Sequence, residues 1–313
     1  MFRFNRKKVK AVLNRKSTVY VLMLLIAILW GYAWVVMKAS LEYMGPFTFT
    51  SFRFAIGSLT LLLIVWVLKL GLPPKKYVKY LIVVGLLQTA AVFLLVMYGL
   101  MFVDAGKSSV LLYSMPIWSS LLAVRFLGEK LELKQLIGLS IGFIGLLTIL
   151  GWDIWIGQTP EMIIGELLIV IAAVVWAVSN IYFRLHVESL PKIQSSAYQM
   201  TFGTIGILLA TLLMEWGEPI VWNATSIFYI VFAGVIASAL CFTLWFMILS
   251  MIDMVTATIA TLLVPISGLI LSAIILGEEM TVSIIVGSGL IIAGIMIAQK
   301  KQSSDKKEMD RTG

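Results

Sequence analysis

The sequence predicts an all-α integral membrane protein with ten transmembrane helices, arranged as two inverted repeats of five helices each. Three observations carry this prediction: a very apolar composition, basic residues confined to alternate loops, and landmarks that recur between the two halves. Hydrophobic residues make up 60% of the 313 residues and charged residues 13%, and the mean hydropathy is +1.01. Soluble domains average about 45–50% apolar and about 25% charged residues, so lipid must be the solvent for most of these side chains.

Apolar runs of membrane-spanning length follow one another from residue 18 to residue 298. A helix needs roughly 20 apolar residues to cross a hydrocarbon core about 30 Å thick. The first run is too long for a signal-peptide core and no small-residue cleavage pattern follows it, which indicates a retained span. Turn residues such as Gly45-Pro46 and Leu190-Pro191 separate the runs. The predicted spans are 18–37, 46–68, 80–102, 108–127, 133–150, 162–183, 195–214, 226–251, 255–276 and 282–298.

Basic residues lie almost entirely on one side of this arrangement. With the N-terminus placed inside, 21 of the 24 Lys and Arg residues fall in inside loops and tails, Lys38 and Lys107 fall outside, and Arg53 lies within the second span. The positive-inside rule therefore predicts a multi-pass protein of the cytoplasmic membrane with both termini in the cytoplasm. We expect cytoplasmic tails at 1–17 and 300–313, a first repeat at 18–151 and a second repeat at 161–299.

The two halves share landmarks at nearly constant offsets. Five helices per half is an odd number, so the halves must cross the membrane in opposite senses, as in transporters built from inverted repeats. Chance similarity among apolar helices is the alternative explanation. At an offset of 149 the matches are Asp104 with Asp253, Pro116 with Pro265 and Gly128-Glu129 with Gly277-Glu278, and at 146 they are Trp30 with Trp176, Lys38 with Arg184 and Gly57 with Gly203.

The scarce residue types exclude several classes of protein. The single cysteine, Cys241, allows no intrachain disulfide, and with the single histidine, His186, it leaves no His/Cys zinc site. The sequence has no GxxxxGK[ST] run and no GxGxxG opening a βαβ unit, which argues against an ATP-driven pump and a dehydrogenase. We expect no metal, no cofactor and no nucleic-acid partner. The expected partners are a small-molecule metabolite and the lipid bilayer.

Two related motifs connect the sequence to a known family. The run Ala105-Gly106-Lys107-Ser108-Ser109 leads through Pro116 to Phe126-Leu127-Gly128-Glu129, and the run from Val264-Pro265 to Leu276-Gly277-Glu278-Glu279 echoes it. With these runs and its two five-helix halves, the sequence resembles the EamA family of the drug/metabolite transporter superfamily over residues 19–298. The resemblance implies ten helices, a central cavity built from helices 1–4 and 6–9, peripheral helices 5 and 10, and export or exchange of amino acids and other small metabolites. The second half departs from the motif, because Thr256 stands where the first half has Lys107.

We therefore expect a secondary transporter that exports amino acids or other small metabolites by alternating access, and not an enzyme. Uptake or exchange by the same fold is one alternative. A membrane enzyme acting on lipid or isoprenoid substrates is the other, although such enzymes usually cluster Asp, Glu or His residues near one face.

Aromatic stripes on the first helix of each half are candidates for the substrate site. Trp30, Trp34 and Lys38 recur every four residues and therefore share one helix face, and their counterparts Trp176, Asn180 and Arg184 do the same. Indole rings stack on organic substrates and attract cations, so we predict that Trp30, Trp34, Trp176 and Asn180 line the substrate site. An interfacial aromatic belt with snorkelling cations is the alternative.

Charged residues within the spans supply the candidate polar contacts. Arg53 lies about seven positions into the second span and is predicted to contact a substrate carboxylate or an acidic side chain, with snorkelling toward Glu42 as the alternative. Its repeat counterpart is Gln199, which we also assign to the site. Glu166 is a candidate proton-coupling group, unless the sixth helix begins at Glu166 and leaves the carboxylate in water.

Weaker candidates complete the predicted site. Gln88, Tyr113 and Tyr198 offer hydrogen bonds to a substrate or between helices. Pro116 and Pro265 lie mid-span, where proline makes a hinge or a fixed kink. Small residues in helices 5 and 10 predict close packing within one chain or across a homodimer, namely Gly138, Gly142, Gly145, Gly287 and Gly294.

Overall fold

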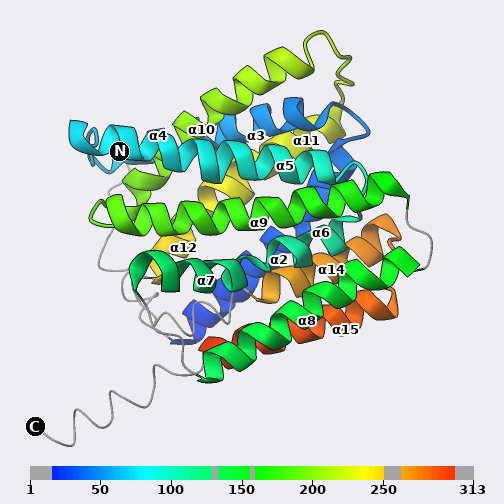
Figure 1. The fold of residues 1–313 in the computed structure, drawn as a ribbon. Coiled ribbons are helices and arrows are strands. Elements are labelled where there is room, and N and C mark those ends of the chain that lie inside the picture. The colour runs from blue at the N-terminus through cyan, green and yellow to red at the C-terminus, as the bar shows by residue number, and fades with distance from the viewer. Residues whose placement is uncertain (1–15, 129–132, 156–158, 250–261, 300–313) are drawn as a thin grey trace, which may run out of the picture.

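The computed structural model describes residues 16–128, 133–155, 159–249 and 262–299, and every regular element in these ranges is helical (Figure 1). The first half contains α2 (Lys16–Ser40), α3 (Pro46–Val67), α4 (Lys75–Val84), η1 (Gly85–Ala91), α5 (Val92–Gly99), α6 (Ala105–Leu112), α7 (Met115–Leu127) and α8 (Leu133–Trp155). The second half contains α9 (Pro160–His186), α10 (Lys192–Met214), α11 (Ala224–Val231), η2 (Phe232–Leu240), α12 (Cys241–Leu249), α14 (Leu263–Leu276) and α15 (Val282–Gln299).

Among the described residues, seven helical segments are long and apolar enough to cross a membrane. They are Val19–Ser40, Pro46–Val67, Lys75–Gly99, Ala105–Leu127, Pro160–His186, Lys192–Met214 and Ala224–Trp245. Three shorter apolar helices are Leu133–Ile149, Leu263–Leu276 and Val282–Ala298. The all-α prediction is confirmed for the described ranges, and each of these segments overlaps one predicted span. The end of span 226–251 and the start of span 255–276 lie outside the described residues.

The helix boundaries differ from the prediction where polar residues continue a helix. The third segment runs over Lys75–Gly99 instead of 80–102, and the sixth over Pro160–His186 instead of 162–183. Hydropathy marks only the apolar core of a span, whereas Pro at the first turn and lysines on the aqueous side are compatible with helical backbone. The structural helices therefore begin earlier than the apolar runs.

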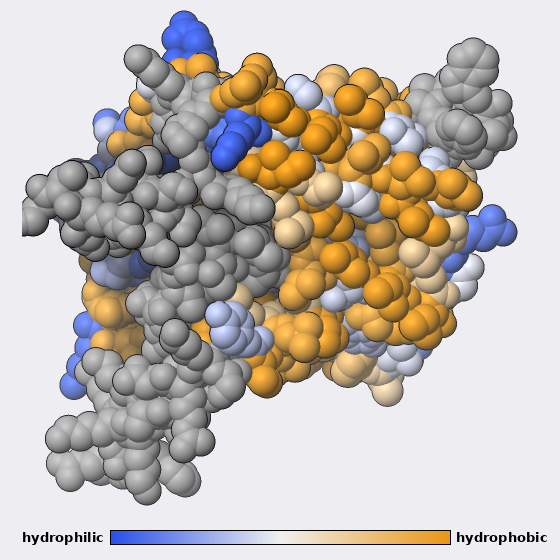
Figure 2. Space-filling view, turned by 90° about the horizontal axis from the view of Figure 1, so that it is seen from below, coloured by the Kyte–Doolittle hydropathy of each residue, from blue (hydrophilic) through white to orange (hydrophobic). Residues whose placement is uncertain are grey.

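The outer surface of the helices is apolar. On the face that includes α8 and α15, hydrophobic side chains dominate and most hydrophilic ones lie toward the ends (Figure 2). Exposed residues on these two helices include Leu136, Ile144, Leu147, Val282 and Ile285. A soluble protein rarely exposes contiguous apolar patches beyond a few hundred Å². This surface suits contact with lipid and fits a multi-pass membrane protein.

In the part of the chain that the structure describes, three spans depart from regular α-helix. The π-helical segment η1 interrupts the third span, and η2 interrupts the eighth at the matching repeat position. The fourth span is broken at Tyr113 and Ser114, directly before the α7 turn that contains Pro116. π-Helical turns are rare in proteins, and those that occur frequently lie at functional sites. These irregular segments are therefore candidates for the functional site.

The main helix pairings join the two halves. Helix α2 packs most extensively on α14, α3 on α10, and α8 on α15, and α9 packs on α5 and α7. Glu215 at the end of α10 accepts hydrogen bonds from the backbone N–H groups of Phe47 and Thr48 at the start of α3. Gln194 near the start of α10 donates to the carbonyls of Leu70 and Gly71, just after α3. The helices α3 and α10 therefore run antiparallel.

Glycines bring α8 and α15 together within one chain. A Cβ placed on Gly138 would lie 2.5 Å from the Gly294 carbonyl oxygen, and one on Gly145 would lie 2.6 Å from that of Gly287. These contacts leave no room for larger residues, as expected where helices approach closely. The glycine faces are thus occupied inside the chain, the first of the two options that the sequence left open. A homodimer through the glycine-containing helices 5 and 10 stays a prediction.

Candidate functional site

Arg53 lies in α3 and is buried, with 5% of its surface exposed. Its Nε donates a hydrogen bond of 3.3 Å to Ser238 Oγ in η2, and its Nη1 lies 2.9 Å from Met37 Sδ. The guanidinium also lies over the rings of Phe54 and Phe93, 5.0 and 4.8 Å from their centroids. The snorkelling alternative for Arg53 is therefore wrong.

The guanidinium of Arg53 has no carboxylate partner among the described residues. A thioether is a weak acceptor, and a guanidinium has five N–H donors to satisfy. Aromatic rings offset part of the desolvation cost of a buried cation, whereas a carboxylate or phosphate would match both its charge and its fork-shaped donor geometry. The side chain is thus equipped to bind an anionic group from outside the protein.

Gln199 occupies the equivalent position in the second half. It is buried in α10, and its Oε1 accepts a hydrogen bond of 3.0 Å from Thr89 Oγ1 in η1. The offset of 146 relates Arg53 to Gln199, and the offset of 149 relates Thr89 to Ser238. Each half therefore supplies one long polar side chain, and the other half supplies the hydroxyl that it contacts from a π-helical segment.

Close helix packing holds these two polar pairs in place. A Cβ on Gly85 would collide with the Gln199 carbonyl oxygen, and one on Gly234 would lie 2.9 Å from the Arg53 carbonyl oxygen. These two glycines are themselves related by the offset of 149. Only glycine allows such approach of one backbone to another. The backbone carrying each polar residue is therefore fixed against the π-helical segment of the opposite half.

The tryptophans of the predicted stripes all lie in or against the large apolar cluster. Trp34 is buried in the large apolar cluster, near Gly268 of α14. Trp30 donates from Nε1 to the Ala237 carbonyl at 2.9 Å and packs against the rings of Phe242 and Trp245. Trp176 is half-buried and packs against the same apolar cluster as Trp34. Trp34 is buried, and Trp30 and Trp176 are half-buried against neighbouring helices. A role for these rings in substrate binding stays a prediction.

The remaining predicted hydrogen-bonding residues are distributed through the bundle. Asn180 approaches Met115 Sδ at 3.3 Å, and Gln88 accepts from Ser179 at 3.4 Å. Tyr113 is half-buried and forms the break in the fourth span. Tyr198 donates to the Gly71 carbonyl at 3.2 Å, so it contacts the chain just after α3 and lies apart from Arg53.

The two predicted hinge prolines lie in different local structures. Pro116 follows the break at Tyr113 and Ser114, and its carbonyl accepts a hydrogen bond from Ser120. Pro265 is buried near the start of α14, and the residues that precede this helix up to 261 lie outside the described part of the chain. Whether either position moves stays a prediction.

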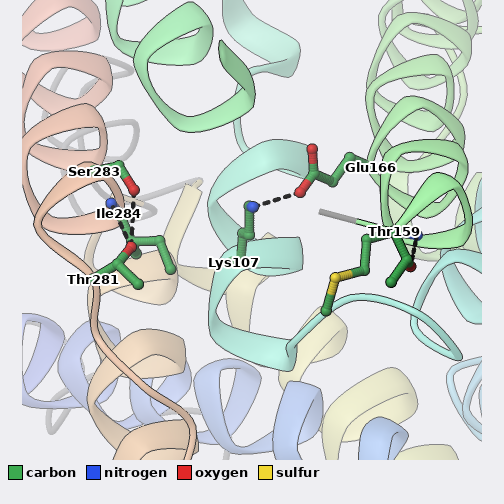
Figure 3. Close-up of polar contacts among 7 residues, drawn as sticks. Lys107, Thr159, Glu166, Thr281, Ser283 and Ile284 are labelled. Atoms are coloured by element: carbon green, nitrogen blue, oxygen red, sulfur yellow. Dashed lines mark hydrogen bonds and ion pairs between the residues drawn. The ribbon is translucent and has the colours of Figure 1, made fainter. Parts of the chain in front are cut away.

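A second buried charge, Lys107, joins the halves through an ion pair with Glu166. Figure 3 shows Lys107 on α6 and Glu166 on α9 pointing toward each other. Both are buried, with 6% and 2% of their surfaces exposed. Glu166 is the seventh residue of α9, which begins at Pro160, so the alternative of a water-exposed carboxylate at the helix start is wrong.

Further polar contacts gather where α6 begins. Lys38 Nζ donates to the carbonyls of Leu100 and Val103 at 2.6 and 2.9 Å. Glu278 accepts from the backbone N–H groups of Ala105 and Gly106 at 2.7 and 3.0 Å. A carboxylate at a helix N-terminus satisfies free donors and interacts favourably with the helix dipole. These contacts connect both halves at this end of the bundle.

Asp104 precedes α6, outside the membrane-spanning segments. Its pKa is raised, first because the surrounding chain removes water from its carboxylate and second because the Glu278 carboxylate is nearby, while Lys38 and Lys107 act in the opposite direction. The end of the bundle is therefore an electrostatically coupled cluster. Within the described ranges, no group of three His, Cys, Asp or Glu side chains is arranged to hold a metal ion.

Sequence reasoning missed three residues of this arrangement: Ser238, Thr89 and Met37. Serine and threonine are common in apolar helices, where they bond to the preceding turn, so neither type signals a site by itself. Extending the offset of 149 to the third and eighth spans would have paired Thr89 with Ser238. That pairing was the available signal.

Comparison with known proteins supports a transporter family over nearly the whole chain. The model of the EamA-like transporter family matches residues 17–151 and 163–299. The chain is 30% identical over 273 residues to "Uncharacterized transporter YoaV" of Bacillus subtilis, covering 87% of this chain and 93% of that protein. It is 27% identical to a "Probable amino-acid metabolite efflux pump" of Salmonella typhimurium, covering 88% and 93% of the two chains.

Two further comparisons extend this result. A "Probable terminal-alkyne amino-acid exporter" of Streptantibioticus cattleyicolor is 24% identical, covering 93% of this chain and 96% of that protein. A solved crystal structure matches with a TM-score of 0.63 at 19% identity, covering 90% of this chain and 97% of the other, and so has the same fold. The family match spans both halves of the chain, in agreement with the repeat seen in the sequence. This chain belongs to the EamA-like transporter family.

Proposed function

We propose that the protein is a secondary transporter that exports amino acids or other small metabolites across the cytoplasmic membrane by alternating access. The observation that carries the proposal is the buried Arg53 guanidinium, which meets Ser238, Met37 and two aromatic rings but no described carboxylate. Family membership supports transport, and the names of the relatives from Salmonella and Streptantibioticus support amino-acid compounds as cargo.

The proposed role of Arg53 is to bind the carboxylate of the substrate. A charged side chain within a span costs upward of about 2.5 kcal/mol unless it faces protein, water or a partner charge. Arg53 bears this cost without a described protein carboxylate, which is explained if a transported anion is its partner. Trp30, Trp34 and Trp176 would provide the aromatic surface against which the organic part of the substrate packs.

We further propose ten transmembrane helices in two inverted halves, with both termini in the cytoplasm. The antiparallel pairing of α3 with α10 supports inversion, and the distribution of basic residues supports the orientation. Single cysteines introduced at Gln158 and at Ser303 should react with a membrane-impermeant reagent from opposite sides. Labelling of both from the same side would contradict this topology.

Proton coupling by Glu166 stays a prediction with a condition attached. Protonation of Glu166 in the observed arrangement would leave the Lys107 ammonium buried without its carboxylate, which is unfavourable. A coupling role therefore requires that the ion pair opens in the opposite-facing state, where the carboxylate is free to take up a proton. Transport driven equally well with and without a proton gradient would contradict this role.

The function is tested by comparing the metabolites that cells release with and without the protein, by untargeted mass spectrometry. Arg53→Met should abolish the release of carboxylate-bearing compounds, whereas Arg53→Lys should retain part of it. Arg125→Met is the matched control, because Arg125 also lies over a phenylalanine ring, at 5.7 Å, but is exposed at the end of α7. Normal release by a folded Arg53→Met variant would overturn the proposal.

The two alternative functions predict different results in the same system. Uptake would appear as faster entry of the metabolite into vesicles that contain the purified protein. Exchange would appear as counterflow of the metabolite when the vesicles are loaded with it on one side. A membrane enzyme would change the chemical form of a lipid or isoprenoid without moving a solute. The names of the relatives refer to transporters and give the enzyme no support.

A further inference from the structure

The two pseudo-equivalent polar pairs differ in charge. Arg53 with Ser238 presents a cation, whereas Gln199 with Thr89 presents a neutral amide at the corresponding place in the other half. Arg53 is the eighth residue of α3, and Gln199 is the eighth residue of α10. Because these two helices are related by the repeat and run antiparallel, the two residues lie at equivalent depths from opposite ends of the bundle. The difference in charge is therefore a difference between two otherwise matching positions.

Both polar pairs adjoin the third span. The Arg53 guanidinium lies 4.8 Å from the Phe93 ring centroid, and Phe93 follows Thr89 by four residues on the same span. Four helical residues advance about 6 Å along the axis. The two pairs therefore adjoin this span about one helical turn apart, a spacing at which one small carboxylate metabolite is expected to contact both.

The amide of Gln199 has hydrogen-bonding capacity to spare. Among the described residues it makes one side-chain hydrogen bond, between Oε1 and Thr89, and its Nε2 makes none. A primary amide can make about four hydrogen bonds. A neutral polar group of a substrate would satisfy this amide, whereas a second carboxylate placed there would be desolvated without a cation to balance it.

We propose that Gln199, positioned by Thr89, is a specificity-determining residue that restricts the transporter to substrates with one carboxylate, such as amino acids with uncharged side chains. This inference rests on the proposed carboxylate contact of Arg53. Arg53 binds the single carboxylate, and Gln199 contacts the uncharged far end of the same molecule. Dicarboxylates are excluded because their second charge meets an amide where a second cation would be needed.

The test compares the compounds released by cells carrying the wild type or Gln199→Arg, sorted by their number of carboxylates. The wild type should release monocarboxylates. Gln199→Arg should increase the release of dicarboxylates at least about tenfold, because a guanidinium binds a carboxylate through two charge-assisted hydrogen bonds. Gln199→Met is the size control and should weaken release of monocarboxylates without admitting dicarboxylates.

The Gln199→Arg variant carries two buried arginines and could misfold for that reason. An exchange variant with a single arginine controls for this effect. Arg53→Gln combined with Gln199→Arg keeps one cation and moves it to the pseudo-equivalent position, so it should recover the monocarboxylate release that Arg53→Gln alone loses. Three results would overturn the inference. They are an unchanged selectivity of folded Gln199→Arg, the release of dicarboxylates by the wild type, and the loss of all release from both Gln199→Arg and the folded exchange variant.

The outcomes also separate this inference from the proposed function. If Arg53→Met leaves release unchanged, the carboxylate contact itself is wrong. If Arg53 is required but Gln199→Arg does not alter which compounds are released, only the role of Gln199 fails.

Discussion

Two buried cations, Arg53 and Lys107, are treated in opposite ways by the same fold. Lys107 lies on α6 and forms an ion pair with Glu166 of the other half. Arg53 lies on α3 and meets a serine, a thioether and two aromatic rings. Both side chains are almost fully buried, so the difference lies in their partners and not in their exposure.

From this contrast we expect Lys107 to serve the structure and Arg53 to serve ligand binding. A buried ion pair is strongly destabilised when one partner is removed, because the other charge remains buried without compensation. A buried cation without a carboxylate already carries that cost, so its removal should weaken the fold little. Lys107 is therefore expected to matter for stability, and Arg53 for transport.

The largest expected effect is on the paired cation. Glu166→Ala should lower the free energy of unfolding by about 3–5 kcal/mol, because it leaves Lys107 buried without the carboxylate of its ion pair. Thermal unfolding of the detergent-solubilised protein measures this loss. Glu188→Ala removes an exposed carboxylate just after α9 and is the control. Equal melting temperatures for the two variants would contradict the structural role of the ion pair.

Removing both charges should recover most of that loss. Replacing buried ion pairs by apolar residues of similar volume is often neutral or stabilising, by up to about 4 kcal/mol. The double variant Lys107→Met with Glu166→Leu should therefore melt near or above the wild type and well above Glu166→Ala. A double variant as unstable as Glu166→Ala would show that packing at this site, and not charge balance, determines the stability.

Removal of the unpaired cation should have a smaller effect on the fold. Arg53→Met loses contacts with Phe54 and Phe93, worth up to about 2 kcal/mol when desolvated, but it also relieves the burial of the charge. We expect a net change of no more than about 1–2 kcal/mol in unfolding free energy. Chemical denaturation beside Glu166→Ala gives the comparison, which fails if the two variants are equally unstable.

Glu278 offers a finer test of the end of the bundle near Lys107. Glu278→Gln keeps the shape of the side chain, but its amide has a single acceptor oxygen. One of the two charge-assisted hydrogen bonds accepted from the N–H groups of Ala105 and Gly106 is therefore lost, and the other becomes a weaker neutral one. The expected loss is about 1 kcal/mol in unfolding free energy. Glu279→Gln changes the neighbouring carboxylate and is the matched control. No difference between the two would contradict a special role of Glu278.

The smallest effect concerns pH and Asp104. Its pKa is raised in the folded chain, so the folded state holds this proton more tightly than the unfolded state does. Lowering the pH from neutral through the raised pKa toward the ordinary carboxyl pKa of about 4 should therefore stabilise the fold through this group. Asp104→Asn should melt slightly higher at neutral pH and lose part of that dependence. A steeper pH dependence in Asp104→Asn would reverse the assignment.

The sequence was sufficient for the features that depend on local composition. Apolar runs predicted the spans, because membrane insertion depends on about 20 consecutive residues. The depth of Arg53 followed from its distance to Pro46, and Gln199 followed from the repeat offset. Family membership followed from the motif around Pro116 and its echo in the second half, and the family comparison confirms it.

Features that depend on contacts between distant helices were not predictable. The sequence placed Lys107 in a loop, because Asp104-Ala105-Gly106 has the composition of a turn. In the structure α6 begins at Ala105, whose N–H group is satisfied by Glu278 from far along the chain. The π-helical segments leave no mark in an apolar sequence, because hydropathy does not distinguish one helical period from another when every face is apolar.

The main helix pairings join one half of the chain to the other, which affects folding during synthesis. Helices of the first half leave the ribosome before their main partners exist: α2 packs on α14, α3 on α10, and α8 on α15, the last helix described. The glycine face of α8 must therefore stay in contact with lipid, or with the insertion machinery, until α15 arrives. We therefore expect the first half to complete its packing late in synthesis. A ribosome stalled before α15 should leave an inserted but protease-sensitive intermediate, which becomes resistant only when the final helix joins α8.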